Sequence, residues 1–464
     1  MRTSTKAVIT GAWLAVVIPQ IFTTYGSHPD GWQLARNARL IWEHGSYFAS
    51  RGIGFPLHEI LVTPMIIAGD WVGGNLLSVM AGLAFLIGLF KLADLKNIRH
   101  PLLVIAGLAF LPIVIHQATS TIDFMFLLTF CLWSYICLIQ GRYYLAGVLI
   151  GIACGFRISA CIMIGPTVLY VWQERREFKT PLIMFLIAAA TGVLAFSPAL
   201  LTIGIRPFGR DVPFVQMMTL GLYQFLRVFG VAQIAVLGLS LGTGLWFVWK
   251  NEREYLWSPH AIFHGANIIM WTVVFFTFSI KSEYWILAVP SVIFAADRLL
   301  SGRLLTVLVI FLLSYHVVEL NLVGGESGKR YVRPHIDSGY TVKIIQLRQF
   351  MKSYRAAANR FNPAEPTLIM FGKSWVPVGN PLWEYDKALG IWHRKDSKLY
   401  MSALITVERH MRIVHERGIR MYAWRGDKAP YMTTVSRDIW GRYVSIVDDL
   451  GAFLGQPIQG RWIR

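Results

Sequence analysis

Long apolar runs constrain this chain more than any other feature. Eleven of them occupy its first 322 residues, at 7–25, 73–92, 101–116, 124–139, 143–156, 158–172, 181–203, 231–249, 260–279, 285–299 and 304–322. A helix that crosses a bilayer needs about 20 apolar residues. The whole chain is 55% hydrophobic and only 15% charged, whereas an ordinary soluble domain carries about 25% charge. The sequence therefore predicts an α-helical polytopic membrane protein with about eleven spans in residues 1–322.

The charges of the connections predict the orientation. With a cytoplasmic N-terminus, the inside connections and the run ends beside them hold thirteen Lys and Arg residues, and the longer outside connections hold eight. Because Lys and Arg beside a span resist translocation, this orientation is favoured in a cell inner (plasma) membrane. Runs 143–156 and 158–172 are separated by little more than Arg157, and one kinked segment there would reverse everything downstream. Two separate spans keep the basic cluster Arg175–Lys179 inside, so we expect eleven.

An odd number of spans places residues 323–464 outside, in the periplasm. This tail holds 23 basic and 12 acidic residues, a net charge of +11. The periodicity of its apolar residues predicts helices at 340–361, 398–416 and 436–453 and strands at 366–371 and 419–424, which is typical of a small α/β domain. Its positive surface is either simply solvated or directed to anionic lipid headgroups or a polyanionic glycan.

The connection between the first two runs is too long and polar to be a mere linker. Its apolar spacing over residues 33–44 predicts a helix along the membrane surface. Residues 55–69 form an apolar stretch that is short for a membrane span and contains Glu59 and two prolines, so we expect a second surface helix there. This connection also contains the polar candidates His28, Arg51 and His58.

Two carboxylates stand hard against the outer boundary of the predicted spans. Asp30 follows the first run by five residues, and Asp123 precedes the fourth. Either residue has a structural alternative as the N-cap of the helix that follows it. Two acids at one boundary also suit the orientation of an acceptor hydroxyl and the removal of its proton.

Cations collect at the same outer boundary. They are Arg157, Lys281, Arg206 and Arg210, and Lys281 is followed by Glu283 and Tyr284. Arginine offers phosphate a bidentate fork, and lysine offers a point charge. The alternative for each cation is a long side chain that reaches from the bilayer to water. Together they predict a site for the phosphate of a lipid.

These elements resemble the GT-C superfamily of integral-membrane glycosyltransferases, of the protein mannosyltransferase and aminoarabinose transferase type. The resemblance covers about residues 7–300 and rests on short motifs: His28-Pro29-Asp30 after the first span, the element Ser50 to Glu59, Thr121-Ile122-Asp123, the glycines before Arg157, and Glu283-Tyr284. It implies an enzyme that moves a hexose or pentose from a polyprenyl-phosphate donor to a lipid, glycan or protein acceptor.

The resemblance also implies roles for particular residues. Asp30 matches the catalytic base, and Asp123 the acid that assists acceptor or donor binding. Arg157 and Lys281 match the residues that hold the lipid phosphate, with Arg206 and Arg210 on the same rim. His28, Arg51, His58, Glu59, Glu283 and Tyr284 are the expected substrate-binding residues. The chain departs from the paired acids of many members, because Gly31 follows Asp30.

We expect no cofactor and no nucleic-acid partner. The alternative is a divalent metal held by His28, Asp30, His58 and Glu59, but scattered ligands of this kind specify no metal geometry. Gly324 to Lys329 superficially resembles a phosphate-binding loop, yet its glycine spacing and the Arg330 that follows do not fit the motif.

Two other classes of function fit a chain with these spans. A transporter or flippase for a lipid-linked glycan would show internal repeats and charged or broken spans near the midplane. A non-catalytic partner in envelope assembly would use the tail as its binding module. The polar residues gather at the outer boundary rather than at mid-span, which favours the glycosyltransferase.

Overall fold

A computed structural model describes most of the chain. The described residues are 1–26, 29–51, 53–95, 98–204, 218, 222, 231–277, 282–314, 319–324, 330–335, 340–371, 383–386, 391–403, 408–424, 444–447 and 450–455. Contacts divide the chain into two compact units. Unit 1 comprises Met1–Gln20, Tyr47–Leu61 and Asn75–Val342, and unit 2 comprises Ile21–Ser46, Val62–Gly74 and Lys343–Arg464.

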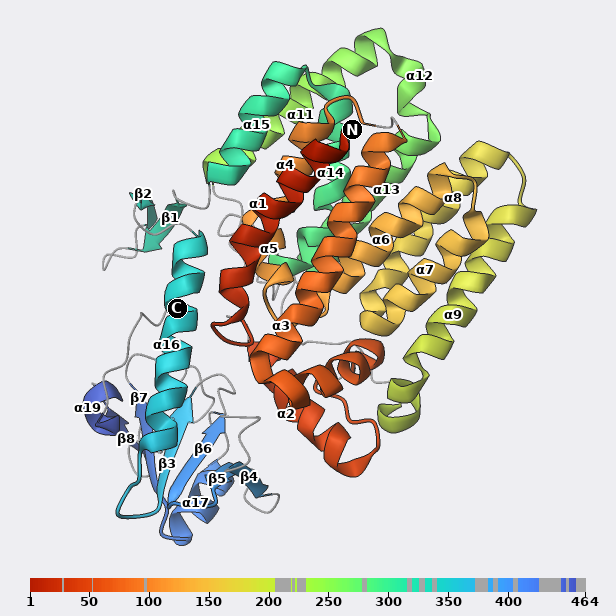
Figure 1. Cartoon of the computed structure of the whole chain (residues 1–464). Helices are drawn as coiled ribbons and strands as arrows, with labels where there is room; N and C mark the ends of the chain where they lie inside the picture. The colour runs from red at the N-terminus through yellow and green to blue at the C-terminus, as the bar shows by residue number, and fades with distance from the viewer. Residues whose placement is uncertain are drawn as a thin grey trace. The chain divides into compact units, whose positions relative to one another are not determined.

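Unit 1 is built from helices (Figure 1). Those wholly or mostly within it are α1 Thr3–Ile21, α3 Pro56–Asp94, α4 Pro101–Ala109, α5 Pro112–Ala118, α6 Phe124–Ile139, α7 Tyr143–Phe156, η1 Ile158–Met163, α8 Ile164–Arg175, α9 Lys179–Ile203, α11 Val231–Asn251, α12 Arg253–Leu256, α13 Pro259–Thr277, η2 Ser282–Leu287, α14 Val289–Leu299 and α15 Gly302–Ser314. The short strands β1 Glu319–Gly324 and β2 Arg330–His335 form an antiparallel pair.

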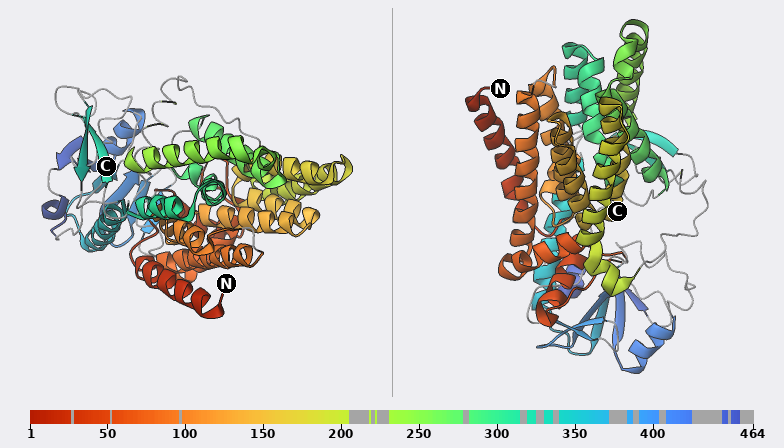
Figure 2. Two further views of the ribbon diagram at one scale, coloured as in Figure 1. Left: turned by 90° about the horizontal axis from the view of Figure 1, so that it is seen from above. Right: turned by 90° about the vertical axis from the view of Figure 1, so that its right-hand side faces the viewer.

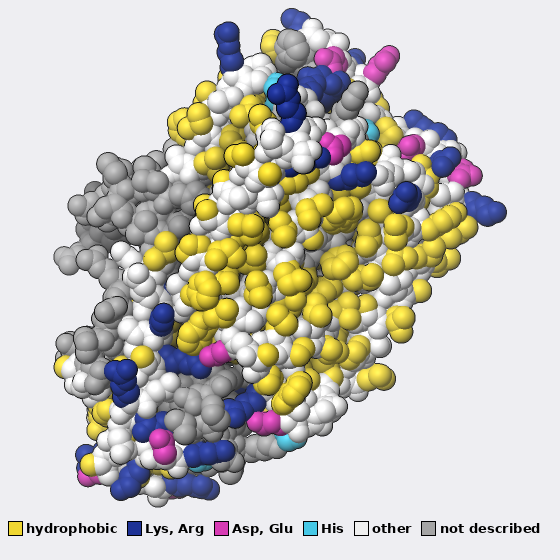
Figure 3. All heavy atoms as spheres, viewed as in Figure 1, with side chains coloured by type: hydrophobic (Ala, Val, Ile, Leu, Met, Phe, Trp, Pro, Cys, Tyr) yellow, Lys and Arg dark blue, Asp and Glu magenta, His cyan; other side chains and the backbone are white. Residues whose placement is uncertain are grey.

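The lengths of these helices are compatible with a helical membrane protein. Among the described residues, α1, α3, α9 and α13 are long and apolar enough to cross a bilayer, and α4 with α5 forms a fifth candidate bent by 58°. Figure 3 shows hydrophobic side chains over the middle of these helices, with Lys and Arg toward the end that carries the N-terminus. Large apolar side chains of α9, such as Leu194 and Leu201, are exposed, as contact with lipid requires. The count of eleven spans stays a prediction.

Small residues let α7 and α9 lie close together, side by side in Figures 1 and 2. A Cβ atom on Gly151 of α7 would lie 2.5 Å from Cβ of Thr191 and 2.8 Å from the carbonyl oxygen of Ala188. A Cβ atom on Gly155, one turn further, would lie 2.6 Å from Leu57 of α3. Helix pairs in bilayers associate through such small residues because these permit close van der Waals packing. This packing positions the C-terminal end of α7, where Arg157 follows.

The structure corrects two of the predicted segments of unit 1. The predicted helix at 55–69 is present, but it continues through a break at Asp70 into the next apolar run, forming α3. The last apolar run was expected to be helical to residue 322, and that is wrong, because α15 ends at Ser314 and residues 319–324 form β1. Its β-strand pairs with β2, a partner that local hydropathy does not reveal.

Unit 2 contains a mixed sheet. Its elements are α2 Pro29–His44, α16 Tyr340–Arg360, β3 Thr367–Phe371, β4 Trp383–Asp386, β5 Ile391–Arg394, β6 Leu399–Ala403, α17 Glu408–Glu416, β7 Arg420–Trp424, β8 Val444–Val447 and α19 Leu450–Leu454. The strand order is β4-β5-β6-β3-β7-β8, parallel from β6 to β8 and antiparallel between β4, β5 and β6. Leu368, Met370 and Met421 of the sheet pack against Met411 and Val414 of α17.

Two predicted helices of the tail are partly strands. The segment 398–416 was expected to be one helix, but residues 399–403 form β6 and only 408–416 are helical. The segment 436–453 contains β8 and the short α19. Both strands are short and lie beside partners remote in sequence, so their formation depends on pairing rather than on local periodicity. The helix expected at 340–361 is confirmed as α16, and the strands at 366–371 and 419–424 as β3 and β7.

The break in α3 is held by side chains of unit 2. Asp70 has φ 51°, a left-handed conformation that is costly for a residue with a Cβ atom. Its carboxylate accepts a short hydrogen bond from the Tyr25 hydroxyl and lies 3.0 Å from Nη2 of Arg355 in α16. The Arg355 guanidinium also lies 4.7 Å from the ring of Trp71. The ion pair and the hydrogen bond therefore stabilise a strained backbone.

Candidate functional site

Asp123 lies in unit 1 at the end of a loop tied to α3. The loop joins α5 to α6, and two hydrogen bonds attach it to α3: Ser78 Oγ donates to the Ser120 carbonyl oxygen at 2.7 Å, and Thr121 Oγ1 donates to Asn75 Oδ1 at 2.8 Å. Asp123 occupies the N-cap position of α6, but its carboxylate makes no capping hydrogen bond. The alternative prediction, that the Asp123 carboxylate caps α6, is therefore wrong.

The Asp123 carboxylate instead holds two arginines. Arg51 Nη2 donates to Oδ1 at 2.9 Å, and Arg157 Nη1 donates to Oδ2 at 2.5 Å. Arg51 comes from the connection before α3, and Arg157 follows α7 directly in an extended conformation. Three separate parts of the chain thus supply one ion cluster, which we call the Asp123 cluster.

Aromatic rings surround the guanidinium groups of this cluster. The Arg157 guanidinium carbon lies 4.0 Å from the ring centre of Phe124, 4.8 Å from that of Tyr284 and 5.1 Å from that of Phe55. The Arg51 guanidinium lies 3.7 Å from the ring of Phe55. Stacking of this kind fixes the plane of a guanidinium and excludes water from its faces.

The cluster is buried and carries an excess of positive charge. The side chains of Asp123, Arg157 and Arg51 are 0%, 3% and 12% exposed. Burial by itself raises the pKa of the Asp123 carboxyl, but the charges of Arg157 and Arg51 outweigh it and hold that pKa well below its usual range. The carboxylate is thus ionised at neutral pH. Two guanidinium groups and one carboxylate leave one positive charge, which suits an anionic ligand.

Glu59 organises the connection that carries Arg51. Its Oε1 accepts a 2.8 Å hydrogen bond from the Ser50 backbone N–H, and its Oε2 accepts one of 3.0 Å from the Phe55 backbone N–H. The hydroxyls of Ser50 and Tyr47 donate short hydrogen bonds to the same carboxylate. Burial, and after it the charge of Glu59, raises the pKa of Tyr47, which therefore stays a donor. The Glu59 carboxylate thus fixes the conformation of the connection between Tyr47 and Phe55.

His58 and Gln117 of unit 1 are buried polar residues whose side chains make no hydrogen bond to any described residue. The His58 ring packs edge-on against Phe126 at 5.3 Å, and Gln117 precedes the Asp123 loop. Buried polar groups in folded proteins are nearly always paired with protein, water or a ligand. Both side chains can therefore donate or accept a hydrogen bond with a bound molecule.

An apolar cavity of 440 Å³ is lined in part by residues that lie next to the two arginines in the sequence. Its lining includes Ile53, two residues after Arg51, and Ile158, the residue after Arg157. The remaining wall comes largely from α9, including Ala188, Val193, Phe196 and Leu200. A cavity with this lining suits a hydrocarbon chain.

The structure brings together part of the predicted site. Arg51, Asp123, Arg157 and Tyr284 form one cluster, and Glu59 shapes its loop. Asp30 lies in unit 2, buried in the first turn of α2. That helix begins at Pro29, so Asp30 lies inside its first turn, where a negative charge is favoured by the helix dipole.

Apart from the buried His58, the remaining predicted residues lie outside the described part of the chain. These are His28, Arg206, Arg210 and Lys281, together with the side chain of Glu283. The sequence reasoning missed Tyr47, Phe55, Phe124 and Gln117. Their one signal was their position, because Tyr47 and Phe55 lie in the first outside connection and Gln117 and Phe124 lie at the ends of the second.

A metal site is not formed by the described residues, because none of their His, Cys, Asp and Glu side chains gather in groups of three or more. Comparison with protein-family models and with curated proteins finds no match to this chain.

Proposed function

We propose that this chain is a membrane glycosyltransferase that moves a sugar from a polyprenyl-phosphate donor to an acceptor hydroxyl at the outer face of the membrane. The observation that carries the proposal is the buried Asp123 cluster, with its excess positive charge, next in sequence to the walls of an apolar cavity. A phosphate joined to a long hydrocarbon chain has the chemistry that this pair of features would bind.

The proposed reaction divides its charges among named residues. The bond between the anomeric carbon and the donor phosphate oxygen breaks, and a bond from that carbon to the acceptor oxygen forms. The phosphate leaves with an added negative charge, which the guanidinium groups of Arg157 and Arg51 stabilise. Asp30 accepts the proton of the acceptor hydroxyl as general base. Asp123 is a positioning residue, because both its oxygens are bonded to the arginines.

The proposal includes a topology. Eleven spans with a cytoplasmic N-terminus place residues 323–464 outside, as an α/β domain. The enzyme is a hexosyl- or pentosyltransferase in the inner membrane, and its acceptor is a lipid, a glycan or a protein. No nucleotide enters the reaction, because the lipid phosphate itself activates the sugar.

Transport of a lipid-linked glycan is the second candidate. The observation in its favour is a set of buried polar side chains within helices, among them His264 and Asn267 of α13. Polar residues within spans are costly and often mark transport paths. A transporter would move the intact lipid-linked glycan and release no polyprenyl phosphate.

The test uses the full chain in proteoliposomes with polyprenyl-phosphate hexoses and pentoses as donors. We expect release of polyprenyl phosphate by the native chain, and losses of about 10²-fold or more in Asp30→Asn and Arg157→Gln. Arg303→Gln, which changes an exposed arginine of α15, serves as the matched control and should keep full turnover. Unchanged turnover in Asp30→Asn would remove the base assignment, and flipping without release would favour transport.

A further inference from the structure

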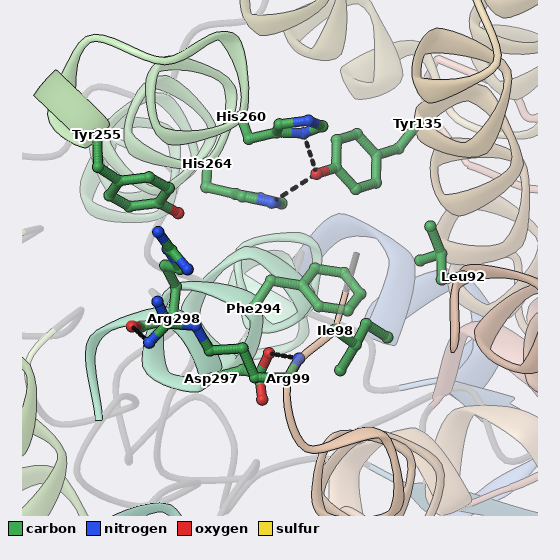
Figure 4. A pocket seen from close by; sticks show the side chains of 10 residues that line it. All are labelled: Leu92, Ile98, Arg99, Tyr135, Tyr255, His260, His264, Phe294, Asp297 and Arg298. Carbon is green, nitrogen blue, oxygen red and sulfur yellow. Dashed lines mark hydrogen bonds between the residues drawn. The ribbon is translucent and has the colours of Figure 1, made fainter. Parts of the chain in front are cut away.

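A second cavity, separate from the Asp123 cluster, lies between helices of unit 1. Its volume is 270 Å³, and Figure 4 shows its lining side chains, which come from α3, α6, α13 and α14, from the turn before α4 and from α12. Tyr135 of α6 lines it, twelve residues after Asp123. At 1.5 Å per helical residue, the two positions are about 18 Å apart along α6. The cavity is therefore not part of the proposed catalytic site.

One wall of this cavity is a chain of hydrogen bonds. The Tyr135 hydroxyl lies 3.0 Å from Nδ1 of His260 and 2.9 Å from Nε2 of His264, as the dashed lines in Figure 4 show. On the far side of His264, Nδ1 lies 3.1 Å from Ser291 Oγ, which accepts a 2.7 Å hydrogen bond from Asn267 Nδ2. Five side chains of α6, α13 and α14 thus form one continuous polar row.

One order of protons satisfies Ser291, Tyr135 and both histidines. In this order the Ser291 hydroxyl, whose oxygen accepts a hydrogen bond from Asn267 Nδ2, donates its proton to Nδ1 of His264. His264 therefore carries its own proton on Nε2 and donates it to Tyr135. The Tyr135 proton then goes to Nδ1 of His260, so a neutral His260 carries its proton on Nε2. His260, which lines the cavity, then has an N–H group free to donate.

The opposite wall carries two arginines. The Arg298 guanidinium lies 4.6 Å from the ring of Tyr255, and one of its nitrogens lies 3.3 Å from Glu252. Arg99 donates from Nη1 to the carbonyl oxygen of Arg298 at 3.0 Å. A guanidinium has five N–H donors, so each arginine keeps most of them for a ligand. The Tyr255 hydroxyl lines the same space and has no hydrogen-bond partner among the described residues.

The one carboxylate that lines the cavity is already engaged. Asp297 is buried, and its two oxygens accept hydrogen bonds of 2.7 and 2.8 Å from the backbone N–H groups of Arg99 and His100. The His100 ring nitrogen Nδ1 lies 3.0 Å from the same carboxylate. Asp297 therefore fixes the turn that carries Arg99, and both of its oxygens are engaged there.

We propose that this cavity binds a phosphate group, held by Arg99 and Arg298 and by the donors of Tyr255 and His260. Donors converge on the space from both walls, while its single carboxylate is engaged by the turn. Phosphate accepts several hydrogen bonds and pairs with arginine forks. The volume of 270 Å³ admits a phosphate with a small organic substituent.

Two sources supply this chemistry. Arg99 is exposed, and Arg298 and Glu252 are more than a third exposed, so the cavity is reached from the surface of the unit. A phospholipid headgroup enters from the membrane boundary, and a soluble phosphate enters from water. The same protein donors bind either one, and only the probe distinguishes them.

The test measures thermal unfolding of the full chain in phosphatidylcholine nanodiscs, because a ligand that binds the folded state raises the unfolding midpoint. One arm titrates inorganic phosphate, and the other compares nanodiscs with and without phosphatidic acid. We expect stabilisation in at least one arm. Stabilisation by inorganic phosphate identifies a soluble ligand, and stabilisation by phosphatidic acid alone identifies a lipid headgroup.

Three variants locate the site. Arg298→Gln and Tyr255→Phe should each weaken the apparent affinity at least about tenfold, since each removes a hydrogen bond to a charged group. Tyr255→Phe keeps the ring that contacts Arg298, so it still tests phosphate binding if Arg298→Gln does not fold. Arg303→Gln removes an exposed arginine that does not line the cavity and should keep native affinity. Stabilisation in neither arm, or equal weakening in Arg303→Gln, would overturn the proposal.

Discussion

Nη1 of Arg157 lies 2.5 Å from Oδ2 of Asp123, across 34 residues of sequence. Both side chains are buried, and Arg51 completes the cluster from a third segment. When one buried ion is removed, its partner stays buried without a compensating charge, which is energetically unfavourable. We therefore expect the three residues to stabilise unit 1 only when all of them are present.

Replacement of the central carboxylate should therefore be severe. In Asp123→Asn the two arginines lose their common counter-charge, and we expect the free energy of unfolding to fall by about 3–5 kcal/mol. Chemical denaturation in detergent measures the change. Asp94→Asn, at a surface pair with Lys6, is the control and should have a small effect. A comparable loss in both variants would contradict the role of burial.

The charge of Asp123 also predicts a pH dependence. The folded state holds the Asp123 pKa below its value of about 3.9 in an unfolded chain. The stabilisation from this lowered pKa is thus fully present above about pH 4–5 and is lost as the pH falls toward the folded pKa. The difference in the free energy of unfolding between the native chain and Asp123→Asn should therefore stay constant over about three pH units, from pH 6 to pH 9. A difference that changes across that interval would mean that the carboxyl titrates there.

The close approach of α7 and α9 gives a packing prediction. Gly151→Ala places a Cβ atom 2.5 Å from Thr191 and 2.8 Å from a backbone oxygen, so we expect a loss of about 1–3 kcal/mol. Gly11→Ala in α1 is the matched control, because nothing lies within 4 Å of its added Cβ atom. That control should be neutral or slightly stabilising, since alanine favours helices. Equal thermal stabilities for the two variants would argue against the close packing.

The backbone of Asp70 predicts an order among its variants. Asp70→Gly and Asp70→Ala both lose the contacts with Tyr25 and Arg355, but glycine adopts φ 51° without a Cβ clash. Asp70→Gly should therefore be more stable than Asp70→Ala by about 1 kcal/mol. Thermal melts of the two purified variants measure the difference, and the reverse order would contradict the strained conformation.

The apolar cavity offers a test of donor binding that rests on the proposed function. Val193 lines the cavity and is largely exposed, whereas its neighbour Leu194 is exposed and does not line it. Val193→Trp should fill the space and raise KM for a long polyprenyl-phosphate donor about tenfold or more, as loss of a few buried methylenes implies. Leu194→Trp should leave KM unchanged. An equal change of KM in the two variants would mean that the donor does not bind in this cavity.

Helices were the part of the fold most open to prediction. The segments expected at 124–139 and 143–156 match α6 and α7 to the residue. The helix expected at 33–44 is present as part of α2, and its place at the membrane surface stays a prediction. Each of these elements satisfies its backbone hydrogen bonds locally, so its own run of residues is sufficient to specify it.

Strands and breaks were harder to predict. The tail segment at 399–403 reads as helical by periodicity, yet it pairs with β3 and β5 as β6. The run that ends at residue 322 turns from helix to strand because β2 offers a partner. The backbone groups of a strand are satisfied by another segment, and local sequence does not say which one.

The sequence by itself determined a helical membrane protein, and it singled out Arg51, Asp123, Arg157 and Tyr284 as boundary residues. Only the tertiary structure decided that these four meet, that Asp123 holds two arginines rather than capping α6, and that Tyr135 links two histidines beside a second cavity. The physical reason is the range of the interactions. Hydrophobic burial acts on every apolar run wherever it lies, whereas an ion pair or hydrogen bond forms only where folding brings two specific atoms within about 3 Å.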